Sequence, residues 1–213
     1  GPDAFTLLAD RLRDMAYRAS WRVDGRYCPI EGIDLLLVGD VFDLLHSTRW
    51  AEGTPGPENP IRPWDNPHSP PFSATIADIV AGILQQNAES IAILNKMTTG
   101  KAIAIPVNAK TQVGGERSGK RQPVPVHIHY MTGNHDWYFH LPGTTYDAIR
   151  QKVVDALGLA NSPQLFPYHL EESPVLEAVC RAHGVYARHG DFYDPINYDK
   201  SRGRDAAALG DAI

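Results

Sequence analysis

The sequence predicts an α/β fold, in which strands and helices alternate along the chain. Three short runs of strand character, at 33–38, 126–131 and 185–188, each lead into a Gly beside Asp, Asn or His. Segments with helical periodicity lie before and between these runs. Functional loops of α/β proteins follow the carboxyl ends of their strands, so we expect these polar residues to meet at one edge of a sheet.

The first helix and the first strand are predicted from residues near the start of the chain. Pro2 and Asp3 suit a helix start, and the apolar residues that follow recur every three or four positions. The run 33–38 is almost wholly apolar between Gly32 and Gly39. This pattern predicts a short strand that is buried on both faces.

The segment 47–123 lengthens the connection between the first two strands. We interpret it as an insertion of helix and loop within a single domain that spans 1–213. Its prolines between 55 and 71 exclude a helix or a central strand there. Residues 101–122 carry five basic side chains and three glycines, which predict a basic, mobile loop.

One helix is predicted inside this insertion and two more after it. Ser73 is the expected N-cap of the first, whose apolar stripe runs from Ile76 to Leu94. The segment 144–157 begins with a capping-box-like pair, Thr144 and Asp147, and the segment 174–183 follows the N-cap Ser173. Each precedes a glycine, so both are predicted to be helices.

Composition indicates a globular protein with no general affinity for polyanions. The chain has 213 residues, of which 43% are hydrophobic and 21% charged, and its formal net charge is −5. This charge does not favour nucleic acid as a partner. Two cysteines far apart fit a reducing compartment, and no apolar run is long enough to span a membrane. We expect a cytoplasmic location, and the sequence does not indicate an oligomeric state.

Asp40, Asn134 and His189 follow the three predicted strands and form a possible ligand set. Carboxylate, amide and imidazole donors suit Mn, Fe or Zn better than thiolate-binding ions. A carboxylate can bridge two cations, which makes Asp40 the candidate bridge. The alternative is that Gly-Asp only forms a turn or an N-cap. The pair His127 and His129 lies within a predicted strand, and we expect it in or near the core rather than at a metal.

Three motifs, GDVFD at 39–43, GNHD at 133–136 and HGD at 189–191, occur in this order after strands. In this respect the chain resembles the calcineurin-like metallophosphoesterases. The resemblance implies a four-layer αββα sandwich. In the family's numbering, in which the D-x-H motif follows the first strand, the insertion lies between the second and third motif strands, which precede GDVFD and GNHD. The D-x-H and G-H-x-H motifs of that family are absent from this sequence, so we expect the sandwich to be incomplete at both ends.

The resemblance also implies a role for each motif residue. Asp40 would bridge two divalent metal ions, with Mn favoured over Fe or Zn, and Asn134 and His189 would bind the second ion. His135 would meet the substrate phosphate and the leaving group, and Asp43 would orient His135. Downstream of His189, three basic side chains are candidate phosphate contacts: Lys200, Arg202 and Arg204.

The expected activity is metal-dependent hydrolysis of a small phosphorylated substrate by a hydroxide held between two cations. The substrate would be a phosphate monoester, a diester or a nucleotide-diphosphate compound. Two alternatives remain open, a DNA nuclease of the same family and an inactive relative that serves as a binding scaffold.

Overall fold

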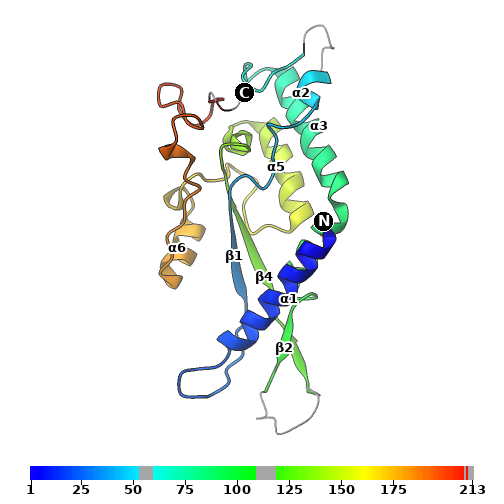
Figure 1. Cartoon of the computed structure of the whole chain (residues 1–213), viewed down its shortest axis with the longest axis vertical. Coiled ribbons are helices and arrows are strands. Elements are labelled where there is room, and N and C mark those ends of the chain that lie inside the picture. Colours follow the sequence, from blue (N-terminus) through cyan, green and yellow to red (C-terminus); the bar gives the residue numbers. More distant parts are fainter. Residues whose placement is uncertain (53–59, 109–118, 209, 211–213) are drawn as a thin grey trace. The chain divides into compact units, whose positions relative to one another are not determined.

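The computed structural model describes residues 1–52, 60–108, 119–208 and 210, and its elements are mixed α/β, as predicted (Figure 1). Its helices are α1 (Pro2–Ala19), α2 (Arg49–Glu52), α3 (Pro70–Gln86), α4 (Ala88–Thr98), α5 (Thr144–Leu157) and α6 (Pro174–His183). Its strands are β1 (Ile33–Val38), β2 (Ala104–Pro106), β3 (Arg121–Pro123) and β4 (Val126–Met131). Short 3-10 helices lie at Trp137–His140, Leu170–Glu172 and Asp191–Tyr193. None of the helices in the described ranges is both long and apolar enough to cross a membrane.

The chain divides into two compact units. The first contains Gly1–Leu35, Asn87–Ile128 and Ala156–Leu159, and the second contains Leu36–Gln86, His129–Asp155 and Ala160–Ile213. Strands β1 and β4 are hydrogen-bonded neighbours, and each begins in the first unit and ends in the second. The described residues of the segment 47–123 are thus divided between the two units, at Gln86 and Asn87.

In the first unit, α1 packs against α4 and β2. Strands β2 and β3 form an antiparallel pair in which Ile105 lies opposite Gln122. The prediction of a loop throughout 101–122 was therefore wrong at both ends of that segment, where backbone pairing prevails over the basic, glycine-rich composition. Residues 109–118, the middle of the predicted loop, lie outside the described residues.

The second unit is built on an aromatic core beneath the ends of β1 and β4. Phe42 and Tyr130 each make an edge-to-face or tilted contact with Phe139, and Phe166 packs against both Tyr130 and Phe139. The buried Arg150 of α5 donates to the carbonyl oxygens of Phe139, Leu141 and Pro163 at 2.7–2.9 Å. These contacts fix the chain that follows the GNHD motif.

One predicted helix is two helices in the structure, whereas α5 and α6 keep their predicted bounds. The stripe from Ile76 to Leu94 belongs to two helices, because Asn87 leaves the helical region at φ −107° and ψ 18°. The first of them, α3, begins at Pro70 rather than after Ser73. A proline pair is well suited to a first helical turn, since the first N–H groups have no partner within the helix.

Two predicted strands also require correction. Residues 185–188 form no strand, because Val185 and Tyr186 are exposed and no neighbouring strand pairs with them in the described chain. Strand β1 has its predicted bounds, but none of its residues is fully buried. Among the described residues β4 is its only strand neighbour, so the expectation of burial on both faces was wrong.

Candidate functional site

Asp40 is held in an unusual backbone conformation at the end of β1. It has a φ of +55°, and it is the single non-glycine residue with positive φ in the described chain. Gly39 before it has a φ of +78°, and a Cβ there would lie 2.6 Å from the Cα atom of Gly133. The two motif loops can therefore approach each other only because both positions are glycine. Backbone strain of this kind is concentrated at functional sites.

Asp136 holds the GNHD turn from inside. Its carboxylate accepts hydrogen bonds from the Gly133 N–H, at 2.6 Å, and from the Tyr130 hydroxyl. The same hydroxyl accepts from the Phe42 N–H at 3.1 Å, which links the GNHD loop to the GDVFD loop. Burial raises the pKa of Asp136 to about 7, although both hydrogen bonds oppose the shift. We therefore assign Asp136 to positioning the loops.

Asp40, Asn134 and His189 meet at one point, although only Asp40 and Asn134 follow strands in the described chain. The Nε2 atom of His189 lies 3.1 Å from Oδ2 of Asp40 and 3.0 Å from Oδ1 of Asn134. The other carboxylate oxygen of Asp40 accepts from the backbone N–H of His135 at 2.8 Å. One carboxylate thus contacts both of the histidines that the family resemblance selects.

The ring of His189 is fixed by its second nitrogen. Nδ1 lies 2.8 Å from the carbonyl oxygen of Val38, so it carries a proton and donates. The hydrogen bond to Asp40 raises the pKa of His189 to about 9, so Nε2 is also protonated near neutral pH. Burial alone would raise the pKa of Asp40, but the hydrogen bonds from His189 and His135 outweigh it and lower that pKa.

A second group forms beside the first and contains Asp43, His46 and His135. The Asp43 carboxylate lies 3.0 Å from Nδ1 of His135 and 2.7 Å from Nδ1 of His46. The three residues also satisfy the spacing of a possible metal site. His46 was missed in the sequence, although its spacing of three positions from Asp43 could have indicated a pair.

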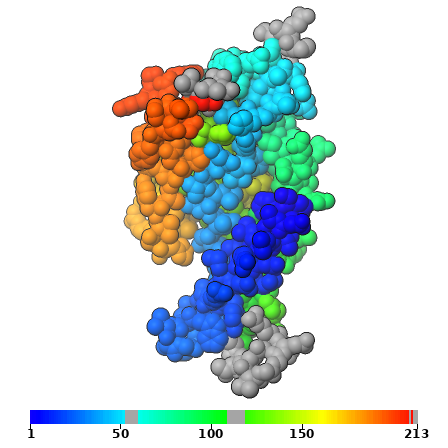
Figure 2. Space-filling view, in the orientation of Figure 1, coloured from blue at the N-terminus to red at the C-terminus, as the bar shows by residue number. Residues whose placement is uncertain are grey.

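The basic candidates downstream of His189 lie in different surroundings. Lys200 and Arg202 are exposed, and Arg202 donates to the carbonyl oxygen of Ala207. Arg204 is largely buried, pairs with both oxygens of Asp191 at 2.9 and 3.0 Å, and lies over the ring of Tyr168. The segment containing these residues, orange to red in Figure 2, forms part of the visible surface.

The two histidines of β4, His127 and His129, differ from each other in burial. His129 is buried, as expected, but His127 is exposed and lies 3.3 Å from Asp34. The expectation that both lie in or near the core was therefore wrong for His127, which stands near the start of β4.

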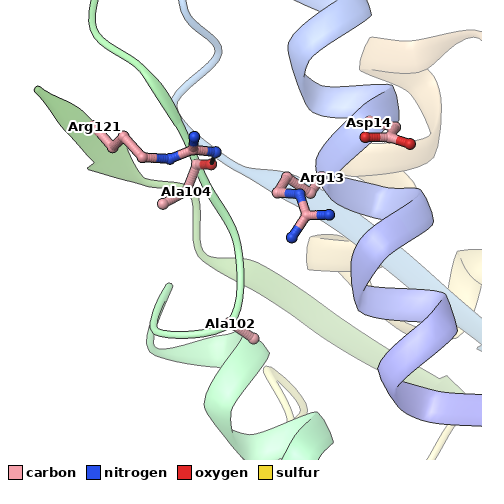
Figure 3. A pocket seen from close by; sticks show the side chains of 5 residues that line it. All are labelled: Arg13, Asp14, Ala102, Ala104 and Arg121. Carbon is pink, nitrogen blue, oxygen red and sulfur yellow. Dashed lines mark hydrogen bonds between the residues drawn. The ribbon is translucent and has the colours of Figure 1, made fainter. Parts of the chain in front are cut away.

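A hollow of about 360 Å³ lies in the first unit (Figure 3). It is lined in part by Arg13 of α1 and Arg121 of β3. Arg13 pairs with Asp10 at 3.0 Å, and Arg121 donates to the carbonyl oxygen of Ala104. Both cations are thus already engaged, and we do not assign this hollow a function.

The donor atoms around Asp40 fit a divalent metal ion. Cations bound at about 2.0–2.2 Å hold neighbouring ligand atoms roughly 3 Å apart, which is the spacing of His189 Nε2 from the two oxygens. A metal-binding histidine usually donates its other ring N–H to a carboxylate, a backbone carbonyl or a water, and His189 donates to the Val38 carbonyl. Asp40, Asn134 and His189 could therefore hold a metal, with Asp43 and His46 as further donors nearby.

No protein-family model, curated protein or solved structure matches the chain. The functional argument therefore depends on the chemistry of these residues.

Proposed function

We propose that the protein is a metal-dependent phosphoesterase with a dinuclear site. The observation that carries this proposal is the meeting of Asp40, Asn134 and His189 within hydrogen-bonding distance, next to a histidine and carboxylate pair. Each motif of the family resemblance supplies one of the three potential ligands. A purely structural turn would not require the strained backbone of Asp40.

When bound, divalent cations supply Lewis-acid activation of water and of the phosphoryl group. Asp40, with two carboxylate oxygens, would hold both cations, and Asn134 and His189 would bind one of them. The Val38 carbonyl keeps the proton on Nδ1 of His189, so Nε2 is the nitrogen that would bind a metal after losing its own proton. The chain's own contribution is therefore a rigid, preorganised ligand set.

His135 would assist the departure of the leaving group. Its Nδ1 atom faces Asp43, whose carboxylate accepts the hydrogen bond from Nδ1–H and so keeps the proton on that nitrogen. Nε2 can then hold a proton near the leaving oxygen and transfer it. Asp43 acts through His135, so it is a positioning residue.

The proposal also includes the layer arrangement of the fold, the cellular location and the substrate class. We infer a four-layer αββα sandwich, of which β1 and β4 supply neighbouring strands, and a cytoplasmic protein. Neither Cys28 nor Cys180 takes part in a disulfide bond within the described chain, which is compatible with that setting. The substrate would be a small phosphate ester or a nucleotide-diphosphate compound, since the net charge of −5 does not favour a nucleic acid.

The test measures metal content and hydrolysis on the same preparation. The purified chain is loaded with Mn²⁺, dialysed, and assayed with an aryl phosphate monoester and a diester. We expect bound metal and metal-dependent turnover of at least one substrate. Tight metal binding without turnover would instead support an inactive scaffold, and preference for single-stranded or duplex DNA would support the nuclease.

A further inference from the structure

A small cavity adjoins the proposed metal ligand Asn134 and contains donors that the mechanism above does not use. Gly133, Asn134, Trp137, Tyr168, Asp191 and Arg204 are among its lining residues. It leaves about 10 Å³ for the centre of a water-sized atom. This is room for a single oxygen atom.

Two of the side chains that line this cavity have buried N–H groups without a hydrogen-bond partner in the described chain. Trp137 is only 2% exposed, and its Nε1 atom has no hydrogen-bond partner among the described residues. The Nε and Nη1 atoms of Arg204 are likewise buried without a partner in the described chain. Buried N–H donors without an acceptor are rare and costly. All three groups can only donate, so the atom that completes the site must be an acceptor.

Asp191 does not supply that acceptor. Both of its oxygens lie at 2.9–3.0 Å from Nη2 of Arg204, which leaves the other two nitrogen atoms of the guanidinium unpaired. The carboxylate does offset the charge of Arg204, so the attraction for an anion is moderate. Tyr168 lies beneath the guanidinium, at 4.0 Å from ring centroid to Cζ, and holds it in place.

We propose that Trp137 and Arg204 form an oxyanion pocket that accepts one unesterified oxygen of a phosphoryl group. The inference deepens and rests on the proposed phosphoesterase function, because Asn134 lines the same cavity. Each phosphate ester or nucleotide-diphosphate compound of the proposed substrate class carries such an unesterified, anionic oxygen. Guanidinium and indole N–H groups are suitable donors to such an oxygen.

The first experiment observes the indole proton of Trp137 directly. The metal-free protein is labelled with ¹⁵N, and the Trp137 signal is assigned by its loss in Trp137→Phe, which keeps an aromatic ring. We expect inorganic phosphate to shift this signal downfield, and Trp137→Phe to weaken phosphate binding about tenfold by calorimetry. The exposed Trp64 provides the matched control through Trp64→Phe, which should bind phosphate as the unaltered protein does.

The second experiment separates anion binding from the ion pair. Arg204→Gln alone would leave the Asp191 carboxylate buried without its partner and could unfold the chain, whereas Asn at position 191 keeps an oxygen that can accept from Nη2 of Arg204. We therefore compare Asp191→Asn with the double variant Asp191→Asn/Arg204→Gln. The first should bind phosphate several-fold more tightly than the unaltered protein, because the competing charge is removed, and the double variant should lose that gain.

Three results would overturn the pocket. They are an unshifted Trp137 signal, equal phosphate affinity in the two Asp191 variants, and acetate binding as tight as phosphate. A buried water held by these donors would give the first two results. Because these measurements need no metal, phosphate binding without metal binding or turnover would refute the proposed function alone. Metal-dependent turnover with an unshifted Trp137 signal would refute the pocket alone.

Discussion

Two pairs of one histidine and one aspartate lie close together in the second unit. The distance between the paired atoms is nearly the same in both, but the side chains differ in burial. His189 is 3.1 Å from Asp40, and His135 is 3.0 Å from Asp43. The His189 side chain is 17% exposed and is anchored at its second nitrogen by Val38. The His135 side chain is 29% exposed, and its partner Asp43 is 49% exposed and is shared with His46.

This difference assigns different chemistry to the same residue types. An anchored, half-buried imidazole next to a carboxylate and an amide has the rigidity that a metal site needs. A pair that opens to solvent can exchange protons during turnover. We therefore interpret the pair of Asp40 and His189 as the ligand pair and that of Asp43 and His135 as the proton-transfer pair, and the following variants test this division.

The largest effect is expected for Asp40→Asn. Asparagine tolerates positive φ, so the loop should keep its conformation while the bridging charge is lost. We expect loss of bound Mn²⁺ and a decrease in turnover of at least about 10³-fold. Metal analysis and aryl phosphate hydrolysis measure both. Asp155→Asn on α5 is the matched control, since this exposed carboxylate contacts Gln151; full metal content in Asp40→Asn would refute the ligand assignment.

His135→Gln should separate binding from rate. We expect Mn²⁺ content to remain within about twofold, because the interaction of Asp40 with position 135 uses the backbone N–H. Turnover should fall by about 10²–10⁴-fold, the usual contribution of a general acid. The deficit should be smaller for an aryl ester with a more acidic leaving group. Equal losses of metal in His135→Gln and Asp40→Asn would break the proposed division between the two pairs.

Local sequence signals located the elements that deliver both pairs. The bounds of β1, β4 and α5 follow from apolar patterning, and α6 follows from the Ser173 N-cap and the left-handed Gly184. These signals act within one or two turns of chain, so the sequence is sufficient to predict them. The meeting of Asp40 and Asn134 could also be expected, since both follow strands.

The parts that sequence did not predict depend on contacts between distant segments. Nothing local indicates that Arg204 pairs with Asp191 and not with solvent. The strand expected at 185–188 has suitable residues but no neighbouring strand among those described. Likewise, the break at Asn87 interrupts an apolar stripe that looks continuous in sequence. Tertiary packing decides each of these cases.

The protonation of His189 gives a pH test of the ligand pair. Its pKa is raised from 6.5 to about 9 by Asp40, so at pH 7 a proton occupies the position that a metal would take. Metal binding must therefore release about one proton, and the apparent Mn²⁺ affinity should rise about tenfold per pH unit between 7 and 9. Calorimetry in buffers of different ionisation enthalpy measures the released proton. A flat affinity over this range would exclude His189 as a ligand.

Without metal, the same shift predicts the direction of pH-dependent stability. A group whose folded pKa lies above its unfolded value stabilises the fold fully below the unfolded pKa. The contribution of His189 is thus complete below about 6.5 and is lost as the pH rises through about 9. Thermal unfolding of metal-free protein should show a lower melting temperature at pH 9.5 than at pH 6.5. His189→Gln should reduce this difference.

The smallest effect is expected for His46→Gln, which tests whether the shared carboxylate matters. Hydrogen bonds from His46 and His135 lower the pKa of Asp43 against the effect of burial, so removal of one partner should weaken that shift. Exposed ion pairs contribute only about 0.2–1 kcal/mol, which corresponds to at most a roughly fivefold loss of turnover. We expect unchanged Mn²⁺ content. In the pH profile of turnover, the acidic limb should move to higher pH, because the pKa of Asp43 rises. The matched control is His68→Gln, because His68 is also exposed.

A loss of metal in His46→Gln would contradict this expectation. It would place Asp43, His46 and His135 at a metal, and the two pairs would then share one function.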